Sequence, residues 1–120
     1  MHESPLVMAY MGDTIYEQYV RRYLILKGYS KIGELQNKSL DYVSAKSQRK
    51  HLERLMDENI LTEEEMDIVK WGRNAKGAKT KNADIVTYRL ATGLEALIGK
   101  LYFDNKFDRI EVIMNFILGE

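Results

Sequence analysis

The stretch RLATGLEALIGKLY, residues 89–102, combines the apolar spacing of a buried helix with two glycines and one acid. A glycine inside a helix costs about 1 kcal/mol relative to alanine, so Gly93 and Gly99 indicate that another helix approaches this one closely. Glu95 lies between the two glycines, with mostly small or apolar neighbours on its side of the helix. Such a glutamate either reaches solvent along a helix contact or serves as a ligand in a functional site.

A second stretch, MAYMGDTIYE at residues 8–17, poses the same question. Gly12 and Asp13 interrupt an apolar run, and on a helix Asp13 would lie near a mostly apolar side. One interpretation is local, with Asp13 or Thr14 capping a helix that begins here. The other is that Asp13 and Glu95, from separate helices, share a hard cation such as Mg²⁺, which prefers oxygen ligands.

Apolar spacing along the whole chain predicts helices throughout. The only proline, Pro5, stands near the N-terminus, so no later helix is broken by a proline ring. Ser44 and Thr62 precede periodic segments and favour helix starts there. The expected helices cover about residues 16–24, 32–43, 45–56, 62–71 and 85–101, with a last one ending near residue 117. The predicted fold class is an all-α helical bundle, a single domain over residues 1–120.

Composition excludes several classes of protein. The chain has 120 residues, of which 45% are apolar and 30% charged, which is typical of one soluble globular domain. It has no cysteine, which excludes disulfides, thiol catalysis and cysteine-ligated zinc. No apolar run approaches the ~18 residues of a membrane span, and no signal-peptide pattern is present. We therefore expect a cytoplasmic protein without membrane contact.

The net charge is zero, but cations and acids are segregated along the chain. Residues 70–81, KWGRNAKGAKTK, hold five cations and no acid, whereas residues 57–67 hold six acids. Segregation of this kind can create a positive patch on a neutral protein. The patch is either an ordinary solvated surface or a contact for phosphates, and a cationic helical segment near residue 50 could extend it. The candidate RNA-binding residues are Arg73, Asn74, Lys76, Lys79, Lys81, Lys46, Arg49 and Lys50.

The predicted loop over residues 72–82 does not fit a nucleotide site. A P-loop reads G-x-x-x-x-G-K-[ST], and here Gly72 and Gly77 fit but an alanine separates the second glycine from the lysine. The segment before the loop is also predicted to be a helix rather than a strand. A nucleotide cofactor is therefore not expected.

His51 has no partner at metal-ligand spacing and is expected at the surface.

The two acidic stretches resemble the motifs of a known family. YMGDTIYE, residues 10–17, resembles the signature helix of ribonuclease III, in which a Leu-Gly-Asp supplies a metal-binding aspartate. LEALIGKLYFD, residues 94–104, resembles that family's Glu-Ala-x-x-Gly-x-x-Tyr helix, which carries the other essential carboxylate. YVSAKSQRKHL and GRNAKG are similar to the short Mini-III branch, a catalytic domain without a double-stranded-RNA-binding domain. The resemblance covers about residues 5–118, with the motifs in the family's order.

The resemblance implies the ribonuclease III catalytic fold and a metal-dependent endoribonuclease that cleaves double-stranded RNA. Asp13 and Glu95 match the catalytic, metal-binding residues, with Mg²⁺ as the cofactor and Mn²⁺ able to substitute. Longer relatives have acids where this chain has Ala9 and Thr92, so the number of bound ions stays open. The resemblance also implies precursor 23S ribosomal RNA as the substrate and a homodimer that cuts both strands. The face around Tyr16 could form the dimer interface or belong to the core.

Two other functions fit a helical scaffold of this size. A catalytically silent RNA-binding or ribosome-associated module would be expected to lose the acids. The presence of both Asp13 and Glu95 therefore favours an enzyme. A helical protein–protein adaptor predicts neither metal binding nor salt-sensitive RNA binding.

Overall fold

The computed structural model describes residues 4–76 and 84–119, and these two ranges form six helices. The helices are α1 (Pro5–Leu26), α2 (Ile32–Val43), α3 (Ala45–Asp57), α4 (Glu63–Arg73), α5 (Ile85–Phe103) and α6 (Phe107–Leu118). The predicted all-α class is confirmed. Within the described ranges, no helix is long and apolar enough to cross a membrane.

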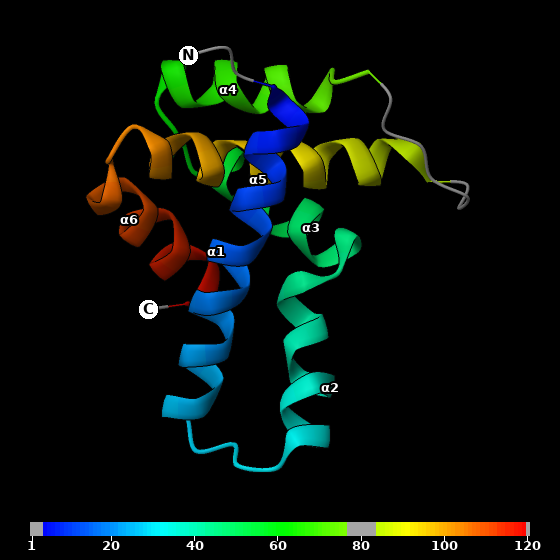
Figure 1. Ribbon diagram of the computed structural model, residues 1–120, viewed down its shortest axis with the longest axis vertical. Coiled ribbons are helices and arrows are strands. Elements are labelled where there is room, and N and C mark those ends of the chain that lie inside the picture. The colour runs from blue at the N-terminus through cyan, green and yellow to red at the C-terminus, as the bar shows by residue number, and fades with distance from the viewer. Residues whose placement is uncertain (1–3, 77–83, 120) are drawn as a thin grey trace.

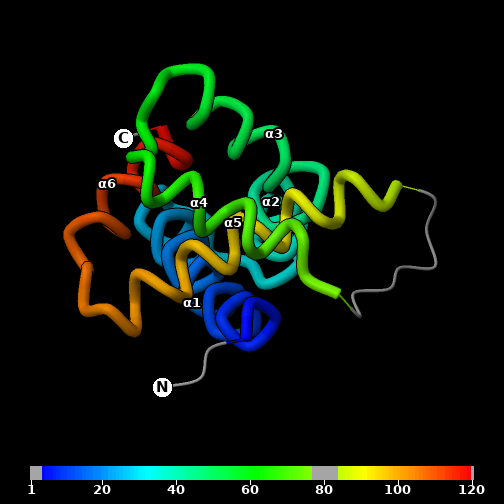
Figure 2. Tube along the Cα trace, turned by 90° about the horizontal axis from the view of Figure 1, so that it is seen from above, coloured from blue at the N-terminus to red at the C-terminus, as the bar shows by residue number. Residues whose placement is uncertain are grey.

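Helix α5 is the central element of the fold. Figure 1 shows it passing behind α1, with α4 running along its upper side, and Figure 2 shows α4 in front of α5 when the molecule is seen from above. Leu94, Leu97 and Ile98 of α5 are fully buried. The core therefore forms around α5, between α1, α3, α4 and α6.

Two glycines bring α1 and α5 into direct backbone contact. A β-carbon on Gly12 would lie 1.8 Å from the carbonyl oxygen of Glu95. A β-carbon on Gly99 would lie 1.9 Å from the carbonyl oxygen of Met8. No side chain fits at either position, so the close approach of the two helices depends on glycine in both. The close helix contact predicted at Gly99 is confirmed.

A second pair of glycines brings α4 against another side of α5. A β-carbon on Gly93 would lie 2.7 Å from the carbonyl oxygen of Val69, and one on Gly72 would lie 2.7 Å from the Ala96 β-carbon. Gly93 and Gly99 are six residues apart, which is about 240° around the helix axis. Helix α5 thus presents one glycine to α4 and the other to α1.

Side-chain caps fix the starts of α3 and α4. The Ser44 hydroxyl accepts a hydrogen bond from the Ser47 N–H at 3.2 Å. Thr62 and Glu65 form a reciprocal capping box at 2.9 and 3.1 Å, so the predicted start of this helix is confirmed. Glu65 also accepts two hydrogen bonds from the Arg109 guanidinium, at 2.8 and 2.7 Å. The same glutamate therefore starts α4 and ties it to α6.

Helix α1 begins earlier than the sequence indicated. It starts at Pro5, with Ser4 as the preceding cap residue, and proline is favoured in the first turn of a helix. Asp13 consequently lies well inside the helix and does not cap it. The interpretation of Asp13 or Thr14 as a helix cap was wrong, because a mid-helix acid and a cap look alike in a short stretch of sequence.

Helix α2 lies beside the second half of α1, and together they form a hairpin that extends away from α5 (Figure 1). The fully buried Tyr16 hydroxyl donates to the Tyr42 carbonyl at 2.7 Å, which fastens the two helices together. Tyr19 and Tyr23 are half-buried and pack against the same core. The tyrosine-rich face of α1 therefore belongs to the core of the protein. Helix α2 itself contains no buried residue.

We expect Gly99→Ala to destabilise the protein by about 1–3 kcal/mol, because the added methyl group forces α1 away from α5. Gly33→Ala is the matched control, since a β-carbon at this exposed position in α2 meets nothing within 4 Å. The free energy of unfolding from urea denaturation measures both changes. A Gly99→Ala variant as stable as the Gly33→Ala variant would contradict the proposed backbone contact.

Candidate functional site

Asp13 and Glu95 come together where α1 crosses α5. Gly12 packs against the backbone of Glu95, so the next residue of α1, Asp13, is placed beside that glutamate. The two carboxyl groups are within hydrogen-bonding reach of each other. Asp13 is exposed, whereas Glu95 is partly buried. The glycine that permits the helix contact thus also brings the two acids into one site.

The site is electrostatically unfavourable for two ionised acids. Burial, followed by the hydrogen bond and negative charge of Asp13, raises the pKa of Glu95 to about 8. Glu17, one helical turn beyond Asp13, adds a smaller upward contribution to this pKa. In the absence of a cation, the pair therefore holds a proton at neutral pH. Such perturbed acids in contact are typical of functional sites.

Gln48 of α3 reaches the same carboxylate and was not found by sequence reasoning. It is only 2% exposed, and its hydrogen bond lowers the pKa of Glu95, as a donor to the charged form does. The available signal was its position in α3, where it continues the buried stripe of Leu52 and Leu55. A polar residue in an apolar stripe indicates a buried hydrogen-bonding partner.

The acid pair suits a hard divalent cation. Carboxylate oxygens are the ligands that Mg²⁺ prefers, and this ion commonly keeps several waters beside one or two protein carboxylates. In the described ranges, no group of three or more histidines and acids is arranged to hold a metal ion. Asp13 and Glu95 are the acids that could hold such an ion at the helix crossing.

Ala9 and Thr92, where the resemblance to longer relatives implies further acids, are both buried. Ala9 is 7% exposed and Thr92 is 5% exposed. The Thr92 hydroxyl donates to the Tyr88 carbonyl of its own helix at 3.0 Å, which is an ordinary intrahelical bond. Neither position supplies a carboxylate to the site.

Most of the described candidate RNA-binding residues are exposed. They are Lys46 and Lys50 on α3, with Arg73, Asn74 and Lys76 at the C-terminal end of α4. Figure 1 shows α4 ending on the side of the molecule at which α5 begins. Lys79 and Lys81 lie outside the described residues.

Arg49 is the exception, because its guanidinium is engaged within the protein. It donates to the Thr87 hydroxyl at 2.8 Å and lies 3.9 Å from Asp84, the residue that caps α5. It also pairs with Glu53 of its own helix at 3.6 Å. Arg49 thus ties α3 to the beginning of α5, and its contact with RNA stays a prediction.

His51 is buried, so the expectation of a surface histidine was wrong. Its ring stacks on Tyr42 with centroids 5.7 Å apart, and its Nδ1 lies 3.1 Å from the Arg54 guanidinium. Because guanidinium can only donate, Nδ1 is the acceptor and Nε2–H faces the Asp41 carbonyl at 3.4 Å. Burial lowers the pKa of His51. The histidine is a packed, neutral member of the core rather than a metal ligand.

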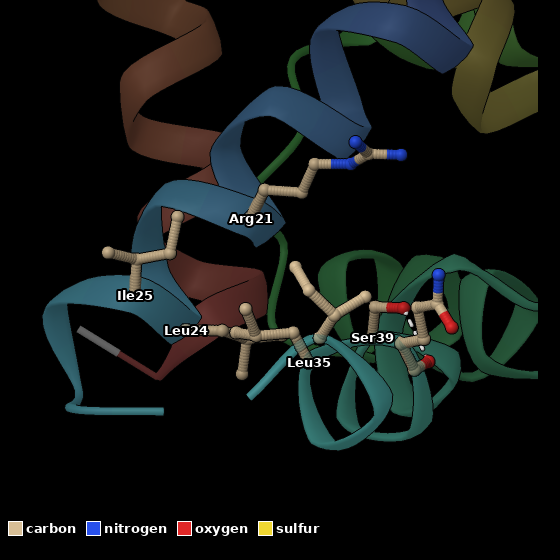
Figure 3. Close-up of a pocket in the computed structure, with 7 residues that line it drawn as sticks. Arg21, Leu24, Ile25, Leu35 and Ser39 are labelled. Atoms are coloured by element: carbon tan, nitrogen blue, oxygen red, sulfur yellow. Dashed lines mark hydrogen bonds between the residues drawn. The ribbon is translucent and has the colours of Figure 1, made fainter. Parts of the chain in front are cut away.

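A separate cavity of about 240 Å³ lies between α1 and α2 (Figure 3). Leu24, Ile25 and Leu35 give it a largely apolar wall, and the Ser39 hydroxyl at its edge donates to the Gln36 carbonyl at 2.8 Å. Neither acid of the candidate site lines this cavity. It is therefore a feature of the α1–α2 hairpin and not of the acid pair.

The raised pKa of Glu95 predicts how metal-free stability depends on pH. An acid with a folded-state pKa of about 8, against an ordinary 4.5, binds its proton more tightly when folded. The protein therefore loses stability as the pH rises from 4.5 to 8. Glu95→Gln should remove this loss and stabilise the metal-free protein above pH 8 by an amount on the order of a few kcal/mol.

Thermal unfolding in a chelating buffer between pH 5 and 9 measures this difference. Glu34→Gln, the same change on the exposed surface of α2, is the control. Parallel pH profiles for Glu95→Gln and the unsubstituted protein would show that folding does not raise the pKa of Glu95.

Comparisons with known proteins identify the family. The family model of the ribonuclease III domain matches residues 6–106. The chain is 50% identical over 116 residues to Mini-ribonuclease 3 of Staphylococcus aureus, covering 96% of this chain and 87% of that protein. It is 41% identical to the Streptococcus pneumoniae Mini-ribonuclease 3 over 94% of this chain and 89% of that one.

A solved structure extends the agreement to three dimensions. A crystal structure of a protein from Fusobacterium nucleatum matches with a TM-score of 0.83 and 33% identity, covering 97% of this chain and 92% of that one. The resemblance found from the two acidic motifs is confirmed. The chain belongs to the Mini-ribonuclease 3 group of the ribonuclease III domain family.

Proposed function

We propose that this protein is a divalent-metal-dependent endoribonuclease that cleaves double-stranded RNA. The observation that carries the proposal is the Asp13–Glu95 pair, which the Gly12 contact holds at the crossing of two helices. The Staphylococcus aureus and Streptococcus pneumoniae relatives are ribonucleases by name, and both acids are present in this chain. A silent RNA-binding module would have no need of two acids in contact, which destabilise the metal-free fold.

The protein's own part in the reaction is to hold ligands in a fixed place. Asp13 and Glu95 would bind Mg²⁺, and helix packing at Gly12 and Gly99 sets their relative position. When bound, Mg²⁺ supplies Lewis-acid stabilisation of a phosphoryl oxygen and lowers the pKa of a bound water. Because Asp13 is exposed, the site is open to a phosphodiester from solvent. Mn²⁺ has a similar preference for oxygen ligands and should substitute.

Duplex RNA suits the distribution of exposed cations. The deep major groove of an RNA helix excludes side chains, so proteins recognise the duplex by its shape, phosphates and 2′-hydroxyls. Lys46 and Lys50 on α3, together with Arg73 and Lys76 at the end of α4, are placed to contact phosphates in this proposal. Thr87, where α3 is tied to α5, lies about 12 Å along the helix axis from Glu95. The cations and the acids could therefore engage one duplex.

The proposal includes a homodimer acting on precursor 23S ribosomal RNA. One site cuts one strand, and two copies related by a two-fold axis match the two antiparallel strands of a duplex. Tyr10 is 82% exposed and Val7 is 56% exposed, both on α1 within two turns of Asp13. These exposed apolar side chains, rather than the buried Tyr16, are the better candidates for the contact between copies.

Replacing either acid should abolish cleavage while leaving the fold intact. We expect Asp13→Asn and Glu95→Gln to lower the rate of duplex RNA cleavage in Mg²⁺ by at least about 100-fold, because each change removes an anionic ligand. Asp67→Asn, at an exposed acid of α4, is the matched control and should retain full activity. Labelled strands of a precursor 23S duplex report cleavage of both strands, and circular dichroism reports the fold.

The same experiment separates the competing functions. Full activity of the folded Asp13→Asn protein would refute the metal assignment. Salt-sensitive binding of duplex RNA without any cleavage by the unsubstituted protein would identify a silent binding module. Cleavage of other duplexes but not of the ribosomal precursor would refute only the substrate.

Replacing exposed cations should weaken RNA binding and reduce its dependence on salt. Each phosphate contact removed lowers the slope of log K against log salt by about one. We expect this for Lys50→Ala and Arg73→Ala, measured by fluorescence anisotropy in the Asp13→Asn background to prevent cleavage. Lys31→Ala, at the start of α2, is the control. Unchanged slopes for both variants would show that Lys50 and Arg73 do not contact RNA phosphates.

A further inference from the structure

We infer that Gln48 is a positioning residue, whose amide holds the Glu95 carboxylate in the orientation needed to bind a divalent cation together with Asp13. The inference rests on the proposed function and extends it to a residue of α3. Gln48 acts through Glu95 and has no direct role toward RNA. Its importance follows from its burial, from the way α3 is fixed to α5, and from the instability of two neighbouring acids.

The burial of Gln48 requires a hydrogen-bonding partner. Glutamine is mostly found at protein surfaces, yet this one is 2% exposed, on the same face of α3 as the fully buried Leu52 and Leu55. A buried amide costs free energy unless it is hydrogen-bonded. The Gln48 amide lies within hydrogen-bonding reach of the Glu95 carboxylate and lowers its pKa, as a donor does. Glu95 is therefore the partner that the buried amide of Gln48 requires.

The residue next to Gln48 fixes α3 against α5. Arg49 donates to the Thr87 hydroxyl of α5 at 2.8 Å and lies 3.9 Å from Asp84. Thr87 lies about two helical turns before Glu95. The position of Gln48 relative to Glu95 is thus set by an adjacent contact between the same two helices. A positioning group needs a rigid support of this kind.

The acid pair needs an orienting donor because its members repel each other when both are ionised. A glutamate has three rotatable side-chain bonds, so a free Glu95 would turn its carboxylate away from Asp13. An amide donor holds one carboxylate oxygen without adding charge, whereas a third acid would increase the repulsion. Hydrogen-bonding partners of metal ligands typically change metal affinity or activity by about 10–100-fold.

Gln48→Met tests the inference, because methionine keeps the length of the side chain and removes the amide. We expect the full-length variant to bind Mn²⁺ about tenfold more weakly, measured by isothermal titration calorimetry without RNA. In cleavage assays, the Mg²⁺ concentration for half-maximal rate should rise and kcat should fall, while KM for RNA stays nearly constant. Gln36→Met, on exposed α2, is the matched control. An unchanged Mn²⁺ dissociation constant in the folded Gln48→Met protein would overturn the inference.

Gln48→Glu keeps the inference testable if the methionine variant does not fold. A third carboxylate facing Glu95 should tighten Mn²⁺ binding and lower the metal-free melting temperature at pH 8. Unchanged Mn²⁺ binding by Gln48→Glu would show that position 48 does not act on the site. If the unsubstituted protein neither binds Mn²⁺ nor cleaves duplex RNA, the proposed function fails together with this inference. If it does both and the two variants behave like it, only the role of Gln48 fails.

Discussion

The backbone contact between α1 and α5 is the constraint on which the rest of the structure depends. Gly12 and Gly99 allow the two helices to touch with no side chain between them. The core residues of α5 can then pack against α1. Asp13, which follows Gly12, and Glu95, one helical turn before Gly99, become neighbours. A shift of α1 away from α5 would separate Asp13 from Glu95. Fold and site therefore share one structural requirement.

The acid pair works against the stability of the fold that holds it. Glu95 is partly buried beside another acid, and its pKa of about 8 shows that ionisation is resisted there. A cation bound by both acids would relieve this repulsion, since opposite charge favours the ionised forms. Functional sites commonly retain strain of this kind because the surrounding structure is stable enough to tolerate it. A bound metal ion would thus reverse the resistance of the pair to ionisation.

Local signals in the sequence predicted much of the fold. The features that the sequence did not reveal depend on contacts between residues far apart in the chain. The capping box at Thr62 and the close approach at Gly99 are each indicated by residue types within a few positions of the sequence. Asp13 was ambiguous locally, between a helix cap and a shared cation site, and the resemblance of its motif and that of Glu95 favoured the shared site. Gln48 and His51 lie in a strongly charged helix, and their burial depends on packing against other helices. Composition and periodicity alone could not show which side of that helix is covered.

The lack of any buried residue in α2 has a consequence for how the protein moves. Segments with few buried contacts open locally at a small free-energy cost, independently of global unfolding. The first half of α2 should therefore exchange its amide hydrogens rapidly, whereas α5 should exchange only when the whole chain unfolds. Protection would then increase from the tip of the hairpin toward the helix crossing. The acids lie at the protected end, so fluctuations of the hairpin leave their geometry undisturbed.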